Sequence, residues 1–331
     1  MIKRQVIYNV GLSVMWLAGL LIGLSGCVPA SAPSMAEAEA GFHMGQADFF
    51  LDEGLTDSAL AAFGLAIEEN PKITDAHIGM GHIYRDRGNF RLASASYQHA
   101  TKLEPNNFDA HYYLGLSYHL WGKIDEAVKT YLRALVIRPE SYDANHHLGS
   151  ALLQQGRVDE AVTYAQRAAN LQKDSMAAWA NLGAAQRLMG NYEEAVEAYR
   201  AANELGEAQT PVLLGMADCL IKLKRYPQAT NVLNVLLSRE KDAVAYERLG
   251  FCYFKQAKYQ TALKHYNAAL ELDADDTSAL NGRGVCLMTQ FVQSAQRDRR
   301  KRDQAIEAWQ RSVEIRPKQP RIIDLITRYQ R

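Results

Sequence analysis

The chain has 331 residues, of which 48% are hydrophobic, and this is enough to bury the cores of two ordinary domains or of one long array. Its 37 basic and 37 acidic residues give a formal net charge of zero. Zero net charge argues against nucleic acid as the main partner, because nucleic-acid binding needs a basic surface.

The first 27 residues differ from the rest of the chain. Lys3 and Arg4 are their only charged residues, and a nearly apolar stretch follows from Val10 to Leu24. A basic start, a short apolar core and small residues just before Cys27 are typical of an export signal. An uncleaved membrane anchor is the alternative, because the stretch is long enough to span a bilayer as a helix.

The residues Leu24-Ser25-Gly26-Cys27 resemble the signal of bacterial lipoproteins, in which the cysteine is lipidated and becomes the mature N-terminus. The resemblance implies lipidation, including palmitate, at Cys27. Because Val28 rather than aspartate follows, it also implies a cell-envelope location, at the outer membrane facing the periplasm. Several acyl chains on one residue anchor a protein stably. Residues 28–39, which contain two prolines and several small residues, are expected to be a flexible tether.

From Ala40 onward the sequence repeats about every 34 residues. This period is expected of stacked pairs of helices. Several positions keep the spacing over three successive units: Pro71, Pro105 and Pro139; Ala66, Ala100 and Ala134; Phe63, Tyr97 and Tyr131; Ala59, Ala93 and Ala127; Gly54, Gly88 and Gly122; Phe50, Tyr84 and Tyr118.

This pattern resembles the tetratricopeptide repeat, which has small residues at unit positions 8, 20 and 27 and large residues at positions 7, 11 and 24. The resemblance implies an all-α, right-handed superhelical solenoid of about eight helix-turn-helix units, closed by a capping helix at 320–331. The units are 40–73, 74–107, 108–141, 142–175, 176–209, 210–242, 243–276 and 277–319, the last with an insertion near 288–302.

Position 8 is glycine or alanine in every unit, and position 20 is always alanine, as in Gly115 and Ala127. We expect these two positions to face each other and to let the paired helices approach closely. A larger side chain at Gly115 would overpack this crossing. Glycine at position 15 suits the chain reversal between the helices. Unit 6 departs by carrying Lys224 there, and unit 4 carries Ala165 where an aromatic residue is usual.

In this family the concave groove is lined by first-helix positions 2, 5, 9, 12 and 13. The resemblance therefore implies a groove that binds a protein or peptide partner, with aromatic residues as rigid contacts. The alternative is that some of these side chains pack against neighbouring helices instead. The groove residues are Ile78, His82, Arg85, Asp109, Tyr112, Leu116, His119, His146, Asp218, Phe251, Phe254 and Lys255.

Charge is distributed unevenly along the chain. Residues 28–106 contain 11 acidic and 5 basic residues, whereas residues 285–331 contain 5 acidic and 11 basic residues. A basic patch lies within the unit 8 insertion and fits an acidic partner or anionic lipid, although a solvated extension of a helix is an equal alternative. The patch consists of Arg297, Arg299, Arg300, Lys301 and Arg302.

Cys219, Cys252 and Cys286 all fall at unit position 10. We expect them to be small buried residues. Equivalent positions on neighbouring units are roughly 8–10 Å apart, whereas a disulfide needs Cα atoms within about 7 Å. A disulfide or thiol metal site is the alternative.

No phosphate loop, zinc-binding helix or nucleophile elbow occurs in the sequence, so we expect no catalysis, no cofactor and no metal. The expected function is a membrane-anchored scaffold that binds protein or peptide partners, for the assembly of envelope, pilus or secretion complexes. The alternatives are a carbohydrate- or peptidoglycan-binding module and an accessory subunit of an enzyme. The oligomeric state is left open.

Overall fold

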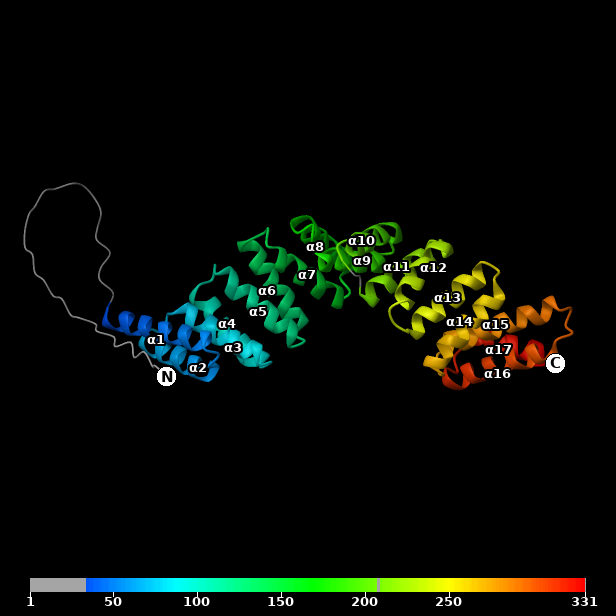
Figure 1. Ribbon diagram of the computed structural model, residues 1–331. Helices are drawn as coiled ribbons and strands as arrows, with labels where there is room; N and C mark the ends of the chain where they lie inside the picture. Colours follow the sequence, from blue (N-terminus) through cyan, green and yellow to red (C-terminus); the bar gives the residue numbers. More distant parts are fainter. Residues whose placement is uncertain (1–33, 207–208, 331) are drawn as a thin grey trace, which may run out of the picture.

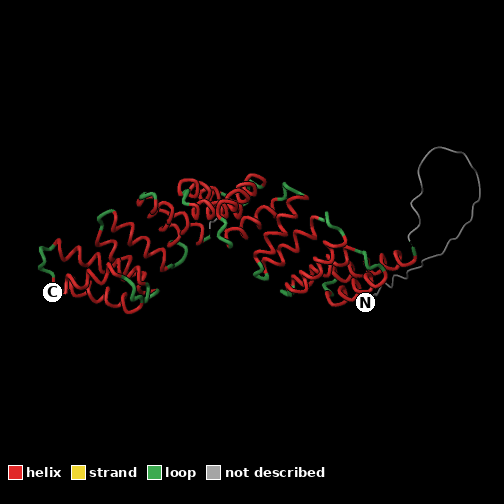
Figure 2. Tube along the Cα trace, turned by 180° about the vertical axis from the view of Figure 1, so that it is seen from behind, coloured by secondary structure: helices red, strands yellow, loops and turns green. Residues whose placement is uncertain are grey.

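A computed structural model of the protein describes residues 34–206 and 209–330, which form 17 helices and no strand. The helices follow one another in chain order along an elongated arch, with the N-terminal and C-terminal helices at opposite ends (Figure 1). The same arch is seen from behind in Figure 2. The helices are α1 (Met35–Asp52), α2 (Thr56–Glu69), α3 (Thr74–Asp86), α4 (Phe90–Leu103), α5 (Phe108–Leu120), α6 (Ile124–Ile137), α7 (Tyr142–Gln154), α8 (Val158–Leu171), α9 (Met176–Met189), α10 (Tyr192–Glu204), α11 (Thr210–Lys222), α12 (Tyr226–Leu237), α13 (Ala243–Lys255), α14 (Tyr259–Leu272), α15 (Thr277–Gln293), α16 (Arg299–Ile315) and α17 (Pro320–Gln330).

Every helix packs against the next one along the chain. Odd-numbered helices α1 to α15 are the first helices of the eight units, and even-numbered helices α2 to α16 are the second helices. Helix α17 packs on α16, where its Ile322, Leu325 and Ile326 contact the apolar core of unit 8. The structure therefore confirms the all-α superhelical solenoid of paired helices with a capping helix.

The first helix begins earlier than the sequence analysis predicted. Ser34 caps α1, since its hydroxyl accepts a hydrogen bond from the Glu37 backbone N–H at 3.2 Å and the Glu37 carboxylate accepts one from the Ser34 N–H at 2.7 Å. This capping box starts the helix at Met35. The prediction of a tether over 28–39 is therefore wrong for residues 35–39.

The predicted signal at 1–27, with Cys27, and most of the remaining tether lie outside the described residues. Within residues 34–206 and 209–330, no helix is both long enough and apolar enough to cross a membrane.

The insertion in unit 8 lengthens its two helices. Helices α15 and α16 have 17 residues each, whereas α13 has 13. Only residues 294–298 connect α15 to α16. Phe291, in the added part of α15, is 5% exposed and packs within the apolar core of unit 8. Four residues of the basic patch, Arg299 to Arg302, form the first turn of α16. The structure of these four residues therefore agrees with the alternative that the basic patch is an extension of a helix.

The glycine at position 8 makes room mainly for the aromatic ring at position 24. A Cβ atom added to Gly115 would lie 2.7 Å from Cδ1 of Tyr131. The predicted contact with the alanine at position 20 holds in unit 4. There Ala165 carries no ring, and a Cβ on Gly149 would meet the backbone of Ala165 at 3.2 Å and of Ala161 at 3.6 Å. Where a ring is present, the ring at position 24 is therefore the nearest neighbour of the glycine.

Cys219, Cys252 and Cys286 are free and fully buried, which confirms that they fill space in the core. Burial raises the pKa of the Cys219 thiol to about 11 and the pKa values of Cys252 and Cys286 to about 12. At neutral pH all three are unreactive thiols.

Candidate functional site

The first helices of the units form a continuous surface. Helix α5 contacts α7, α7 contacts α9, α9 contacts α11, and α13 contacts α15. In Figure 1, α3, α5, α7 and α9 lie toward the hollow side of the arch, and their partners α4, α6, α8 and α10 lie above them. The predicted groove residues all belong to first helices, so they lie on this surface.

The predicted groove residues differ in exposure. Asp109 and Lys255 are exposed. The other ten are half-buried, and several of them contact a neighbouring unit. The half-buried residues are Ile78, His82, Arg85, Tyr112, Leu116, His119, His146, Asp218, Phe251 and Phe254.

Histidine and tyrosine side chains from α3 to α7 contact one another across units 2 to 4. We call them the histidine–tyrosine cluster; its members are His82, Tyr97, Tyr112, Tyr113, Tyr131 and His147. The His82 ring lies 4.5 Å from the Tyr113 ring, and the Tyr131 ring stacks on His147 at 6.1 Å. Such ring contacts contribute beyond the area they bury.

His82 is held as a neutral acceptor. Its Nδ1 lies 2.7 Å from the Tyr97 hydroxyl and 3.3 Å from Nη1 of Arg85. A guanidinium can only donate, so Nδ1 accepts from Arg85 and the Tyr97 hydroxyl also donates to it. Burial, and then the charge of Arg85, lower the pKa of His82, in agreement with a neutral ring.

A cavity of about 570 Å³ lies beside His82 at the junction of units 1 to 3. Arg85 pairs with Asp86 at 2.8 Å, and Arg87 pairs with Asp57 at 2.8 Å. The charges around the cavity are therefore largely balanced, and it carries no strong preference for an anion. Its lining consists of Leu51, Thr56, Gly79, His82, Ile83, Arg85, Asp86, Arg87 and Tyr113.

Tyr112 lies at the centre of the cluster. Its ring stacks on Phe108 at 5.8 Å and lies 5.0 Å from the Tyr113 ring and 6.0 Å from His147. Burial raises the pKa of the Tyr112 hydroxyl above its usual value, so the side chain stays uncharged.

Two predicted groove histidines are fixed by the following unit. The Gln154 amide nitrogen lies 3.0 Å from Nε2 of His119, and the Asn181 amide nitrogen lies 3.3 Å from Nδ1 of His146. An amide N–H donates, so each histidine accepts and is neutral. Burial lowers both pKa values. These bonds set the ring orientations before any partner binds.

In units 6 and 7 an ion pair joins neighbouring first helices. Arg248 holds both carboxylate oxygens of Asp218, one of them at 3.0 Å. Glu247, beside Arg248, has its pKa raised to about 7 by burial, with nearby Arg248 opposing the shift. The ammonium of Lys255 lies 5.3 Å from the Phe251 ring centre. This part of the groove thus combines aromatic side chains with charges of both signs.

The groove analysis missed Glu247 and Arg248. Glu247 occupies position 5 of unit 7, which is one of the groove positions, so the repeat alignment contained the signal. Nothing in the sequence marked Arg248, because its role depends on the separation between α11 and α13.

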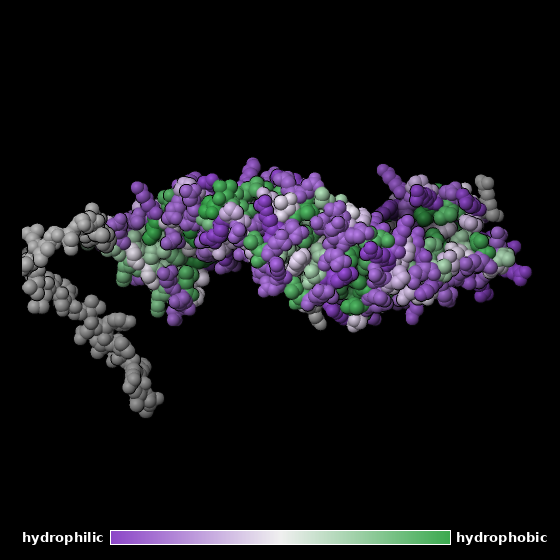
Figure 3. Space-filling model, turned by 90° about the horizontal axis from the view of Figure 1, so that it is seen from above, coloured by the Kyte–Doolittle hydropathy of each residue, from purple (hydrophilic) through white to green (hydrophobic). Residues whose placement is uncertain are grey.

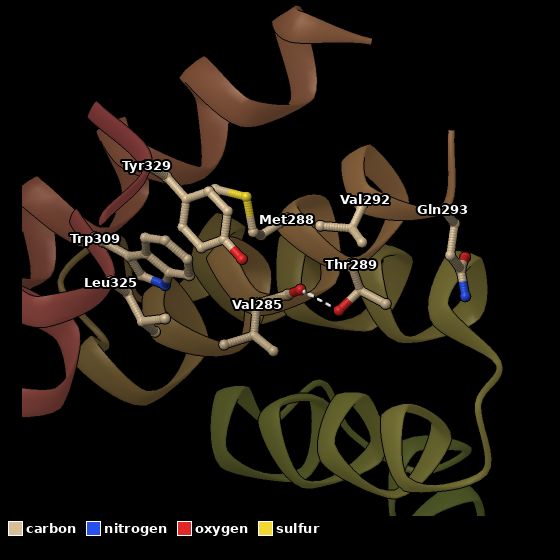
Figure 4. A pocket seen from close by; sticks show the side chains of 8 residues that line it. All are labelled: Val285, Met288, Thr289, Val292, Gln293, Trp309, Leu325 and Tyr329. Atoms are coloured by element: carbon tan, nitrogen blue, oxygen red, sulfur yellow. Dashed lines mark hydrogen bonds between the residues drawn. The ribbon is translucent and has the colours of Figure 1, made fainter. Parts of the chain in front are cut away.

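A second surface that the sequence analysis missed lies at the C-terminal end. An apolar pocket of about 300 Å³ opens between α15, α16 and α17 (Figure 4). The Thr289 hydroxyl donates to the Val285 carbonyl at 2.8 Å, so it offers the pocket little polarity. The pocket is lined by Val285, Met288, Thr289, Val292, Gln293, Trp309, Leu325 and Tyr329.

The described residues contain no group of three or more His, Cys, Asp or Glu side chains placed to hold a metal ion. The histidines of the groove are neutral acceptors bonded to amides, a hydroxyl and a guanidinium.

Solved structures share this architecture. A tetratricopeptide repeat protein from Parabacteroides merdae is 18% identical over 78% of this chain and 99% of its own, with a TM-score of 0.53. Pseudomonas aeruginosa pilF is 23% identical over 62% of this chain and 94% of its own, with a TM-score of 0.52. A chain of the APC/C hetero-tetramer Cut9–Hcn1 is 18% identical over 90% of this chain and 57% of its own, with a TM-score of 0.51. At these identities the likeness concerns the fold alone.

No curated protein matches the sequence. Family models described as TPR repeat match residues 81–122 and 120–156, and models described as tetratricopeptide repeat match residues 146–209, 187–250 and 243–276. Together these matches run without a gap over more than half of the chain. Together with the fold, they show that the chain belongs to the tetratricopeptide-repeat family.

Proposed function

We propose that this protein is a membrane-anchored scaffold that binds protein or peptide partners along its concave face, by binding rather than catalysis. The observation that carries the proposal is the set of half-buried groove rings on three successive first helices. His119 and His146 are held by amides of the next unit and Tyr112 by neighbouring rings. Side chains fixed in advance lose little conformational entropy when a partner binds.

The charge distribution supports a partner that lies along the array in one direction. The N-terminal part is acidic and the C-terminal part is basic. Such a field orients a charged partner during approach, and salt weakens it.

Anchoring through a lipid on Cys27 places the scaffold in the cell envelope, at the outer membrane facing the periplasm. There it serves the assembly of an envelope, pilus or secretion complex. Metabolic labelling with a palmitate analogue tests this: we expect label in the wild-type chain and none in Cys27→Ala. Equal labelling of both would reject lipidation at Cys27.

Charge reversal at the two exposed groove residues tests the binding face. The full-length chain is used to capture proteins from detergent-solubilised membranes. We expect Asp109→Lys with Lys255→Glu to weaken capture of a stoichiometric partner, because both side chains are exposed and their replacement does not disturb the core.

The matched control is Glu126→Lys with Lys129→Glu, the same pair of reversals on exposed residues of α6, a second helix. The control should capture as much as the wild type. Equal loss in both variants would contradict a concave binding site. Retention on cell-wall material with no protein partner would favour the carbohydrate-binding alternative.

A further inference from the structure

Helix α1 exposes an apolar stripe where a further repeat would stack. Met35, Phe42 and Phe49 are 79%, 63% and 59% exposed. At 100° per residue they share one helix face with Ala38 and Gly45, opposite the buried Ala40 and Ala47. Terminal units of repeat arrays usually have a polar outer face, because nothing stacks on it. This outer face is therefore unusual.

The charged residues of α1 are all acidic. Helix α1 contains four carboxylates, Glu37, Glu39, Asp48 and Asp52, and neither lysine nor arginine. By the same angular spacing, Glu39 flanks the stripe on one side and Asp52 on the other. The outer face of α1 is thus apolar along its centre and negative along its margins.

The opposite end of the array has the complementary character. The apolar pocket between α15 and α17 includes Gln293, which also lines a neighbouring depression together with Ser294. Ser294 in turn lines a third depression, which three arginines and one aspartate complete: Arg297, Asp298, Arg299 and Arg300. The apolar pocket is therefore linked to the basic margin through one intervening polar depression.

The charges of this margin are available. Within the described residues, Lys301 pairs with Asp298 at 3.5 Å and Arg302 with Asp303 at 2.8 Å, whereas Arg299 and Arg300 pair with no carboxylate. Both lie in the first turn of α16, where the helix dipole disfavours positive charge. A carboxylate placed beside them would relieve this repulsion as well as neutralise their charge.

We propose that the occupant of this C-terminal surface is α1 of a second copy of the chain. A phenylalanine ring of the stripe, Phe42 or Phe49, fills the apolar pocket, and the carboxylates beside it face Arg299 and Arg300. The two surfaces lie at opposite ends of the arch, so they meet only between copies (Figure 1). Apolar patches are exposed among hydrophilic side chains toward both ends of the molecule (Figure 3).

The contact is head-to-tail, so a pair of copies keeps one free N-terminal surface and one free C-terminal surface. Such contacts generate open chains or closed rings. This association goes beyond the proposed function and does not depend on it: it uses neither the groove nor the lipid on Cys27.

Mixing two defective variants tests the proposal. Full-length chains in a nonionic detergent carry either of two affinity tags, and capture of one tag is scored for the other. The N-face variant is Phe42→Ser with Phe49→Ser, and the C-face variant is Arg299→Glu with Arg300→Glu. We expect each variant alone to lose self-capture by roughly tenfold or more, as when central contacts are removed.

An equimolar mixture of the two variants should restore capture, because each supplies the surface that the other lacks, and it should stop at pairs. Failure of the mixture to restore capture would overturn the proposal. Self-capture retained by the C-face variant but lost by the N-face variant would indicate an α1–α1 contact instead, and would also overturn it.

A photo-crosslinking residue in place of Gly45 gives an independent test in an otherwise unaltered chain. Gly45 lies within the stripe, and a Cβ atom there would meet nothing within 4 Å, so the replacement leaves the fold intact. We expect crosslinks between chains to peptides of α15, α16 and α17. Crosslinks to residues 1–33 of another copy, or only to detergent, would reject this occupant.

Discussion

Units 2 to 5 and units 6 to 8 reach the same fold from sequences of different regularity. In units 2 to 5 the turn between the helices always has glycine in a left-handed conformation, as in Gly122 with φ of 78°. In units 6 and 7 Lys224 and Ala257 adopt the same conformation, with φ of 59° and 58°. Burial between stacked helices, rather than the turn residue, therefore determines the chain reversal.

The comparison extends to the way each region fills its core. Units 2 and 3 place Tyr97 and Tyr131 between helices, and their rings contact the groove histidines His82 and His119. Unit 6 uses Leu233, and unit 8 uses Trp309 under a capping helix. An interior unit is supported from both sides, whereas unit 8 depends on one neighbour and α17. The predictions below test this difference.

The largest effect is expected for Trp309→Ala. Trp309 is 1% exposed, and its indole N–H donates to the Asn281 carbonyl at 3.2 Å. Removing a buried Trp side chain costs about 3–5 kcal/mol. Because unit 8 is terminal, we expect hydrogen exchange to show lost protection in α15 to α17 and unchanged protection in α3 to α10. Equal loss along the whole array would show that the units unfold as one.

Acidification should weaken units 3 and 4 more than the C-terminal units. Burial lowers the pKa of His147 to about 4, so this side chain binds a proton more readily when the chain is unfolded. Its neutral form therefore stabilises the fold fully above about pH 6.5, and this stability is lost as pH falls toward 4. The loss amounts to about 2–3 kcal/mol.

His147→Gln tests the source of this dependence. Urea unfolding of the wild type and the variant is followed between pH 7 and pH 4.5. We expect the variant to lose less stability over this interval, although His82, His119 and His146, whose pKa values are also lowered, preserve part of the slope. Identical slopes for both chains would exclude His147 as a contributor.

Gly115→Ala and Gly149→Ala separate the two kinds of position 8. A Cβ on Gly115 would meet the ring of Tyr131 at 2.7 Å, so overpacking costs about 1–3 kcal/mol. The better helix propensity of alanine offsets up to about 1 kcal/mol of this cost. At Gly149 the nearest atom is a backbone nitrogen at 3.2 Å, which requires only a small shift. We expect thermal unfolding to show a larger loss for Gly115→Ala; the reverse order would contradict the role given to the ring.

The sequence predicted the fold because the pattern of small and large residues that packs two helices together occurs in eight units. The pattern in each unit supports the assignment of the others. The sequence predicted less well where a feature occurs once. The Ser34–Glu37 capping box and the helix extension around Met288 have no counterpart in other units. The contact between His82 and Tyr113 joins two units, so it depends on the superhelical twist, which the repeat period alone does not give.

The smallest effect is expected at the turns, and it tests the opening comparison directly. Left-handed backbone costs a non-glycine residue about 1–2 kcal/mol, part of which glycine loses again through its freer unfolded state. We therefore expect Lys224→Gly to stabilise by about 0.5–1 kcal/mol and Gly122→Ala to destabilise by a similar amount, with opposite shifts in the urea midpoint. Both substituted side chains are exposed at their turns, so packing does not mask the backbone effect. If Lys224→Gly destabilised the protein instead, the lysine side chain would have to make a contact that outweighs the cost of its left-handed backbone. The turn of unit 6 would then not be an unfavourable conformation that helix stacking stabilises.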